Sequence, residues 1–590
     1  MCGLAGILYN RGATPRDRSV LERLAEALRH RGPDGVHIVR MGRADMIHTR
    51  LAIIDINGGD QPISAGAATM IANGEIYNDP DIRRRIGVAH YSTGSDCESA
   101  LRLWERDGSA FASELRGMYA VAIYDDDKGE LTLARDPFGI KSLYIAELPD
   151  GVAFASEPAA LIAAGLAAPG VDPIVRDELL QLQFTTGRRT IFPGITRLLP
   201  GETLRIAAGR LLDRSRRSPL PEGAAEEIDE ATALARLDAA LMDSVRAHER
   251  SDVPFGMFLS GGVDSAAVLA AMARIRREAG GGAPIRAWTA SFDARGVADE
   301  ASAAATLARA VGAAHEAVRV SSGDMWRHLP AIVGSMDDPV ADYAIIPTWM
   351  LARRARESVS VVLSGEGGDE LFAGYGRYRH ATRPWWRGGR RMRRRGMFDG
   401  LGVLRSRPAR WRDGLAGAEM SVVGPTPFSR AQAVDIAEWL PNDLLLKLDR
   451  CLMAHGVEGR TPLLDPVVAK AVWLLPDSLR VRDGRGKWLL RRWLEQALPE
   501  ASPFAPKQGF TVPVGEWIAE AGRKLGPLVA AQPAIAEIAD PDMVRALFKD
   551  ATARRAAPAA WTLLFYALWR RIHVDGAPRD GDVFETLATV

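Results

Sequence analysis

Hydrophobic and polar positions follow two different patterns along the chain, and the change comes near residue 214. Up to about residue 205, short apolar runs alternate with turns that contain Gly, Asp and Asn. Examples are Met118–Tyr124, Leu131–Ala134 and Met70–Ala72, which leads into Asn73-Gly74. Such runs predict short β-strands joined by hairpins. Leucines recur on one face of Ser19–His30, which predicts a helix among these strands.

Beyond residue 225 the pattern is that of helices alternating with strands. A polar stretch with two prolines and a glycine, Arg214–Ala225, predicts a domain boundary. After it, long stretches rich in Ala, Leu and Arg separate the short apolar runs Val253–Leu259, Ala287–Phe292 and Val359–Leu363. This alternation predicts an α/β domain with a parallel sheet and extra helices toward the C-terminus.

Composition narrows the class of protein. The chain has 590 residues, of which 47% are hydrophobic and 25% charged, so it is a globular protein of several domains. Lys plus Arg (75) nearly balance Asp plus Glu (74), which gives no support to a nucleic-acid partner. Cys2, Cys97 and Cys451 lie far apart, which excludes a disulfide framework or a zinc ligand set and suits a reducing compartment.

The chain shows no signal for export or membrane insertion. Its first residues, Met1–Gly6, lack a basic region followed by an apolar run, and Asn10 is already polar. No apolar run approaches the ~18 residues that a transmembrane helix needs. We therefore expect a cytoplasmic protein without membrane contact.

An arginine-rich segment, Arg377–Arg412, allows two interpretations. Its run Arg393–Arg395 and its neighbours Trp385 and Trp386 fit an RNA-binding or polyanion-binding patch. The alternative is a solvated helical insertion whose arginines have no ligand. The balanced net charge favours the insertion, so no nucleic-acid partner is predicted.

Cys2 is the first candidate for chemistry. Removal of Met1 would give it a thiol and a free α-amine on the same residue. Because that amine has a reference pKa of roughly 8, it could act as general base toward the thiol. Taken alone, Cys2 could equally be a small residue at a frayed end.

A series of motifs in fixed order accompanies Cys2. The first part of the chain resembles the class II glutamine amidotransferase domain, which has an N-terminal-nucleophile (Ntn) hydrolase fold, an αββα sandwich. The resemblance covers residues 2–205. It rests on Cys2–Gly6, His30–Asp34, Arg50-Leu51, Asn73–Asn78, Gly94–Asp96, Arg135–Gly139 and Ala155–Glu157.

The resemblance implies a glutamine-hydrolysing site. Cys2 would be the nucleophile, and the Asn73 side chain and Gly74 backbone N–H would donate to the oxyanion. Arg50 would pair with the α-carboxylate of glutamine, and Glu75 and Asp96 with its α-ammonium. The implied glutamine contacts are Arg50, Leu51, Ala52, Ile53, Ile54, Asn73, Gly74, Glu75 and Asp96.

A second motif, Leu259–Ser265, follows an apolar run and precedes the helical stretch Ala266–Ala279. A glycine-rich turn at a helix N-terminus presents N–H groups and partial positive charge to phosphates. The loop lacks the spacing of a Walker A motif. It is similar instead to the SGGxDS loop of enzymes that cleave ATP between the α- and β-phosphates; the alternative is an ordinary glycine turn.

Acidic and basic residues elsewhere strengthen this reading. Asp264 and Asp369, the latter after the run Val361–Leu363, are hard oxygen ligands suited to Mg²⁺ on a pyrophosphate. Lys507 would neutralise charge on phosphate oxygens. Glu366 is either an acid at a helix N-terminus or, as the family resemblance implies, a residue needed to form an acyl-adenylate.

The whole chain resembles the family of glutamine-hydrolysing asparagine synthetases of the bacterial B type, through Leu448–Arg450 and Val457–Asp465 as well. The resemblance implies a glutaminase domain (2–205), a linker (206–235) and a synthetase domain (236–590). Gly459, Leu463 and Ser142 depart from the usual family residues. The implied ATP contacts are Leu259, Ser260, Gly261, Gly262, Asp264, Ser265, Ala294, Ser364 and Gly365.

The predicted reaction is the ATP-driven amidation of the aspartate β-carboxylate through an acyl-adenylate, with Mg²⁺, glutamine as nitrogen donor and an internal passage for ammonia. The products would be asparagine, glutamate, AMP and pyrophosphate. The nearest alternative is the same chemistry on another carboxylate, such as a uronic acid of a glycan or a small peptide. An RNA-modifying pyrophosphatase and a non-catalytic glutamine-binding module are more distant alternatives. The sequence leaves the oligomeric state open, with a homodimer as one option.

Overall fold

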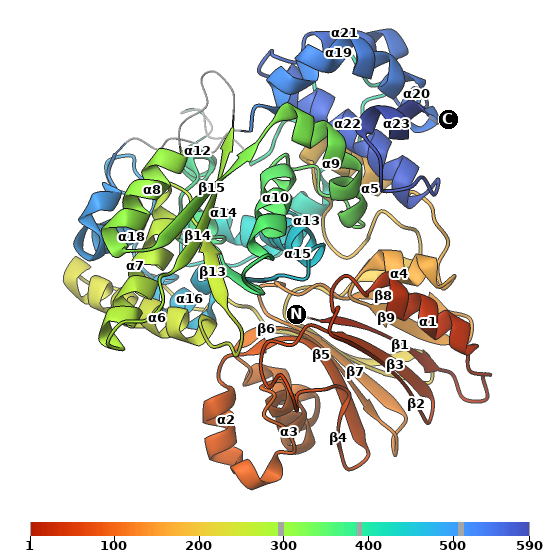
Figure 1. Ribbon diagram of the computed structural model, residues 1–590, viewed down its shortest axis with the longest axis vertical. Coiled ribbons are helices and arrows are strands. Elements are labelled where there is room, and N and C mark those ends of the chain that lie inside the picture. Colours follow the sequence, from red (N-terminus) through yellow and green to blue (C-terminus); the bar gives the residue numbers. More distant parts are fainter. Residues whose placement is uncertain (1, 293–299, 385, 387–391, 506–511, 589–590) are drawn as a thin grey trace.

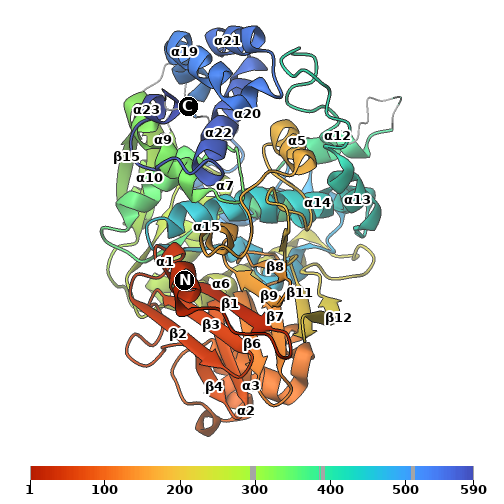
Figure 2. The same cartoon turned by 90° about the vertical axis from the view of Figure 1, so that its right-hand side faces the viewer.

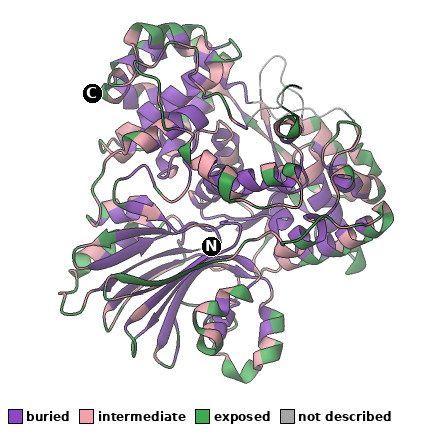
Figure 3. Cartoon of the chain, turned by 180° about the vertical axis from the view of Figure 1, so that it is seen from behind, coloured by how far each residue is buried: buried purple, intermediate pink, exposed green. Residues whose placement is uncertain are grey.

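A computed structural model describes residues 2–292, 300–384, 386, 392–505 and 512–588 (Figure 1). It has two halves, one built on two antiparallel sheets and the other on a parallel sheet with many helices. Figures 1 and 3 place the N-terminus at the junction of the two halves, among buried segments. None of the described helices has the length and apolar character needed to cross a membrane.

The first half contains two six-stranded sheets. Their hydrogen-bonded orders are β10-β8-β9-β1-β3-β2 and β12-β11-β7-β6-β5-β4. The first sheet consists of β1 (Gly3–Tyr9), β2 (Gly35–Met41), β3 (Ala44–Arg50), β8 (Tyr144–Leu148), β9 (Gly151–Ala155) and β10 (Ile195–Arg197). The second consists of β4 (Ile63–Ala65), β5 (Ala68–Ile76), β6 (Gly117–Asp125), β7 (Glu130–Arg135), β11 (Glu202–Ala207) and β12 (Arg210–Arg216).

Helices cover the outer face of each sheet. An apolar core that includes Leu4, Leu8, Ile71 and Leu133 fills the space between the sheets. Successive strand side chains point to opposite faces of a sheet, so one set fills this core and the other packs under the covering helices. The resulting αββα sandwich confirms the predicted Ntn-hydrolase fold. The covering helices are α1 (Arg18–Ala27) and α4 (Pro158–Ala163) on the first sheet and α2 (Asp79–Ile86) and α3 (Glu98–Asp107) on the second.

The predicted turn at Asn73-Gly74 is wrong, because β5 continues through it to Ile76. Asn73 pairs with Ala120 and Gly74 with Tyr119 on β6. A Cβ at Gly74 would lie 2.0 Å from the carbonyl oxygen of Met118, so only glycine allows the two backbones to approach this closely.

The segment between the halves is shorter than the expected linker 206–235. β12 pairs with β11 although its seven residues are exposed, so main-chain hydrogen bonds rather than an apolar face hold it. Helix α6 begins at Glu230. Residues 217–229 are the part that forms neither helix nor strand.

The second half is built around a five-stranded parallel sheet, which confirms the predicted α/β class. Its order is β15-β14-β13-β16-β17, with β13 (Phe255–Phe258), β14 (Arg286–Phe292), β15 (Ala314–Val320), β16 (Val361–Leu363) and β17 (Glu458–Arg460). One face packs on α6 (Glu230–His248), α7 (Val263–Glu278), α16 (Pro466–Val472) and α18 (Trp488–Ala497). The other packs on α9 (Ser322–Ser335), α10 (Ile345–Ala355) and α15 (Leu445–Met453).

The predicted C-terminal helices form a group of their own beside α9, in blue at the top of Figures 1 and 2. They pack against α9 through α22 and α23, within one apolar core. The group comprises α19 (Val514–Ala531), α20 (Pro533–Ala536), α21 (Pro541–Lys549), α22 (Ala556–His573) and α23 (Val583–Ala588).

Two arginines of the arginine-rich segment are packed rather than solvated. The guanidinium carbons of Arg377 and Arg393 lie 3.9 and 4.4 Å from the ring centroid of Trp439. Arg377 also pairs with the buried Asp435 at 2.7 Å. Cation–π stacking and the ion pair therefore fix part of this segment, whereas Arg394 and Arg395 are exposed as predicted.

Candidate active site

Cys2 and Asn73 are brought together where β1 and β5 face each other. The backbone nitrogen of Cys2 donates to Asn73 Oδ1 at 2.9 Å, and both residues are buried. The Nδ2 of Asn73 is also buried and finds no hydrogen-bond partner among the described residues. Because a buried donor without a partner is costly, this atom points to a ligand oxygen. An oxyanion forming next to Cys2 is one group that it could satisfy.

Burial governs the reactivity of the Cys2 thiol. The Sγ contacts the carbonyl oxygen of Leu51 at 4.0 Å. Burial raises the pKa of Cys2 above its usual value, because it disfavours the thiolate. A nucleophile in this setting needs a nearby base.

Arg50 ends β3 and is held by the loop that follows it. It donates to the carbonyl oxygens of Asp55 at 2.7 Å and Ile56 at 3.0 Å, and it pairs with Asp60 at 2.9 Å. The loop begins with the expected glutamine contacts Leu51–Ile54, of which Leu51 and Ile53 are buried. The guanidinium group of Arg50 is thus fixed at the edge of the site, where it could pair with a carboxylate of a ligand.

Glu75 and Asp96 bring two carboxyl groups to the same region. Asp96 accepts a hydrogen bond from the backbone nitrogen of Ile76, next to Glu75 on β5. Burial raises the pKa of Asp96 to about 6 and that of Glu75 well above its usual range. A bound ammonium would favour the ionised form of both groups.

If glutamine is the ligand of this site, the pKa of Asp96 predicts how its binding depends on pH. Asp96 is ionised above about pH 6 and becomes neutral below it. If the carboxylate holds the α-ammonium, affinity falls as the pH falls through 6. Calorimetric titration of glutamine into the Cys2→Ala variant between pH 5 and pH 8 measures this without turnover. An affinity that is flat across this range would contradict the role given to Asp96.

The parallel sheet contributes residues to this site that sequence reasoning missed. Arg460, at the end of β17, is fully buried and pairs with Glu75 Oε1 at 3.0 Å and with Glu458 at 2.6 Å. In the sequence, Glu458 and Arg460 belong to the motif Val457–Asp465 of the second half, which predicts no part for them in the Cys2 site. The partner of Arg460 in the first half, Glu75, is far away in the sequence, beyond the reach of local patterns.

The second candidate site lies at the carboxyl ends of β13 and β16, the edge where parallel α/β sheets bind ligands. A cavity of about 720 Å³ is lined by Leu259–Ser265 and Ser364–Gly367. Ser260 Oγ lies 2.9 Å from Ser265 Oγ and accepts from the Gly262 nitrogen at 3.2 Å, which closes the loop at the start of α7. A Cβ at Gly365 would lie 2.8 Å from the Ser265 nitrogen, so the two loops approach closely.

Asp264 and Asp369 face each other across Lys487. The ammonium of Lys487 contacts Asp264 Oδ2 and lies 2.6 Å from Asp369 Oδ1. Burial alone lowers the pKa of Lys487, but the two carboxylates raise it above its usual value. Lys487 was missed, although a glycine-rich turn, Asp483–Gly486, directly precedes it at the start of α18.

This pair of carboxylates suits Mg²⁺. Among the residues that the structure describes, no group of three or more His, Cys, Asp or Glu is placed to hold a metal. Mg²⁺ is usually bound by one or two carboxylates together with substrate phosphates and water. Asp264 and Asp369 would therefore fit a Mg²⁺ ion that arrives with a nucleotide if the Lys487 ammonium, which lies between them, moves toward the phosphates.

Glu366 and Lys447 also line the cavity. Burial raises the pKa of Glu366, and the nearby Lys447 opposes this rise. Lys447 Nζ donates to Asp342 Oδ2 at 2.8 Å. The predicted site residues Ala294 and Lys507 lie outside the described residues.

Comparison with known proteins gives matches over both halves. A family profile for "Asparagine synthase" matches residues 236–571, and one for "Glutamine amidotransferase domain" matches residues 1–215. A Mycobacterium tuberculosis protein is 33% identical, with 98% of each chain covered. Asparagine synthetase [glutamine-hydrolyzing] 1 of Bacillus subtilis is 29% identical over 98% of this chain and 97% of its own. Asparagine synthetase B [glutamine-hydrolyzing] of Escherichia coli is 30% identical over 88% and 83%.

Proposed function

The chain belongs to the asparagine synthase family, and we propose that it converts aspartate to asparagine with glutamine as nitrogen donor and ATP for activation. One observation carries the proposal. The buried Cys2 lies beside the unpartnered amide donor of Asn73, and the same chain holds a glycine-rich loop of the kind that binds phosphates, next to the carboxylates of Asp264 and Asp369. The names of the relatives agree with this reaction.

In the first half, Cys2 attacks the side-chain amide of glutamine. Its α-amine, freed by removal of Met1, takes the thiol proton, which compensates for the raised pKa of the buried thiol. Asn73 Nδ2 and the Gly74 N–H donate to the oxyanion of the tetrahedral intermediate. Collapse of the intermediate releases ammonia and leaves a glutamyl thioester, which water hydrolyses to glutamate.

In the second half, the aspartate β-carboxylate attacks the α-phosphate of ATP. The Leu259–Ser265 loop and Ser364–Gly365 hold the nucleotide, and Lys487 and Lys507 offset negative charge on its phosphates. Asp264 and Asp369 would hold Mg²⁺, which neutralises charge on the departing pyrophosphate. Glu366 supports formation of the acyl-adenylate, which ammonia then attacks to give asparagine and AMP.

Ammonia must travel between the sites without protonation, because ammonium is not a nucleophile. The Cys2 site is suited to this, since it is buried and its walls include Arg460 from the parallel-sheet half. An internal passage between the halves therefore forms part of the proposal.

The proposal is tested by incubating the protein with glutamine, ATP, Mg²⁺ and aspartate and following products by mass spectrometry. Asparagine, AMP, pyrophosphate and glutamate in equal amounts would support it. Glutamate without asparagine or AMP would leave the glutaminase half standing and contradict aspartate as acceptor. Other carboxylates, beginning with uronic acids and small peptides, would then be tried in the same assay.

A further inference from the structure

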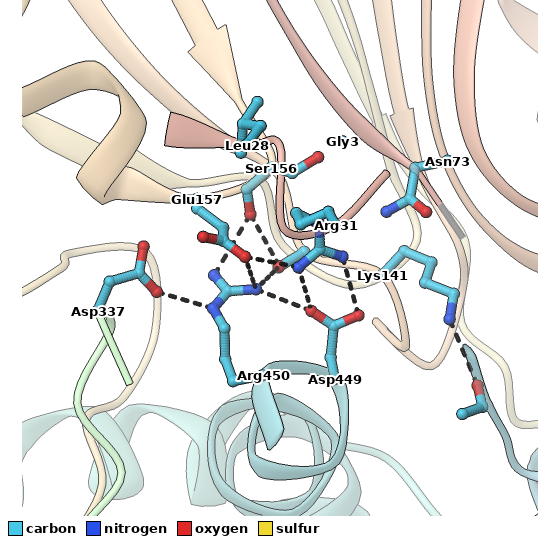
Figure 4. A network of polar contacts seen from close by, with 12 residues as sticks. Gly3, Leu28, Arg31, Asn73, Lys141, Ser156, Glu157, Asp337, Asp449 and Arg450 are labelled. Carbon is cyan, nitrogen blue, oxygen red and sulfur yellow. Dashed lines mark hydrogen bonds and ion pairs between the residues drawn. The ribbon is translucent and has the colours of Figure 1, made fainter. Parts of the chain in front are cut away.

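A buried network of charges joins the glutamine site to helix α15 of the other half (Figure 4). Arg31 Nη1 and Nη2 donate to the two carboxylate oxygens of Asp449 at 2.8 and 3.1 Å. Arg31 Nη1 also pairs with Glu157 at 2.7 Å. Arg450, next on α15, pairs with Asp449 at 2.8 Å and with Asp337 at 2.7 Å. All five side chains are almost completely buried.

Arg31 reaches from this network to the backbone of Cys2. Its Nε donates to the carbonyl oxygen of Cys2 at 3.2 Å. The Cys2 nitrogen is held by Asn73 on the other side, so both backbone groups of the residue are fixed by hydrogen bonds. The position of the Sγ therefore depends on where the Arg31 guanidinium is held.

Asp449 determines the position of that guanidinium. A bidentate pair with a carboxylate fixes both the distance and the plane of an arginine fork. Burial alone would raise the pKa of Asp449, but Arg31 holds it below its usual value, so the carboxylate is ionised. Glu157 contacts a single nitrogen of Arg31, also shared with Asp449, and cannot orient the fork alone.

Asp449 belongs to the half of the chain that binds ATP. Two residues earlier on α15, Lys447 lines the nucleotide cavity. Residues two apart on a helix point about 200° apart, which explains how α15 faces both sites. The glutamine site is thus completed by a residue from the synthetase half.

We propose that Asp449 is a positioning residue for glutamine hydrolysis, which places the Cys2 backbone through Arg31 although it lies in the synthetase half. This inference rests on the proposed role of Cys2 as the nucleophile. It does not depend on which carboxylate accepts the ammonia.

The test measures glutamate release and ammonia-dependent asparagine formation in Asp449→Asn. Displacing a reacting group by about 1 Å can cost about 100-fold in rate. We expect kcat for glutamate release to fall on the order of 10- to 100-fold, while KM for glutamine changes by less than about threefold because Arg50, Glu75 and Asp96 remain. Ammonia-dependent synthesis should stay within about threefold of wild type.

Asp337→Asn is the matched control, since it makes the same change in the same network but contacts Arg450 and not Arg31. Its glutamate release should stay within about threefold of wild type. Arg31→Lys keeps the charge and loses the Nε donor, so it should reproduce the fall in kcat even if Asp449→Asn does not fold. Unchanged kcat in Asp449→Asn or Arg31→Lys, or an equal fall in Asp337→Asn, would overturn the inference. So would a parallel loss of both activities.

Failure of the proposed acceptor is distinguishable from failure of this inference. Glutamate release needs no acceptor and reports on Asp449 directly. If the wild-type protein makes no asparagine, ATP binding replaces ammonia-dependent synthesis as the measure of an intact synthetase half.

Discussion

Replacing Cys2 by alanine is expected to abolish glutamine-dependent asparagine formation and to leave ammonia-dependent formation intact. The variant keeps the backbone nitrogen that donates to Asn73 but lacks the sulfur that would form the thioester. Removing the nucleophile of an enzyme with a covalent intermediate can cost about 10⁶-fold in kcat, so the glutamine-dependent rate should fall by about 10³-fold or more. In the proposed scheme the synthetase reaction takes place in the other half, where ammonia, ATP and aspartate react without the Cys2 thiol. Asparagine is measured with glutamine and with ammonium chloride as alternative donors.

Cys451→Ala is the matched control for this experiment. Cys451 is also buried, and its Sγ donates to the backbone carbonyl oxygen of Ile345 on α10 at 3.5 Å. It should retain both activities. Loss of both activities in Cys2→Ala would show that the two halves do not divide the reaction as proposed. Retained glutamine-dependent synthesis would exclude Cys2 as the nucleophile.

Hydrophobic patterns within short stretches of sequence predicted the strands whose formation depends on those stretches alone. Apolar runs gave the strands β6, β7, β13, β14 and β16 because a buried strand must be apolar over its length. The Asn73-Gly74 pair was misread because the same dipeptide favours a tight turn. Here the absence of a side chain serves close strand pairing, which depends on Met118 far away in the sequence.

The residues that sequence reasoning missed are those with distant partners. Arg460 and Asp449 acquire their roles from Glu75 and Arg31, which the fold brings across the two halves. No periodicity records such a contact. The arrangement of Arg377 on Trp439 was missed for the same reason, since a run of arginines usually indicates a solvated face. Lys487 differs, because the glycine-rich turn before α18 is visible in the sequence and could have indicated a ligand-binding loop.

Replacing Lys487 by alanine is expected to abolish ATP-dependent activation while glutamine hydrolysis continues. Its ammonium lies between Asp264 and Asp369 and is nearly buried. Without this ammonium, the negative charge on the phosphates loses a buried cation, and removal of one group that stabilises developing charge typically costs about 10²- to 10³-fold in kcat. The measurement is aspartate-dependent exchange of labelled pyrophosphate into ATP, with glutamate release followed in parallel.

Two further variants decide what Lys487 contributes. Lys470→Ala removes an exposed lysine from α16 and should leave exchange at the wild-type rate. Lys487→Arg keeps the positive charge but replaces a compact ammonium by a planar fork, which cannot meet both carboxylates at the same distances. It should therefore recover only part of the lost exchange. Full exchange in Lys487→Ala would show that the phosphates are neutralised without this lysine, and equal loss of glutamate release would indicate a folding defect instead. Retained hydrolysis with lost exchange is the outcome that assigns Lys487 to nucleotide chemistry.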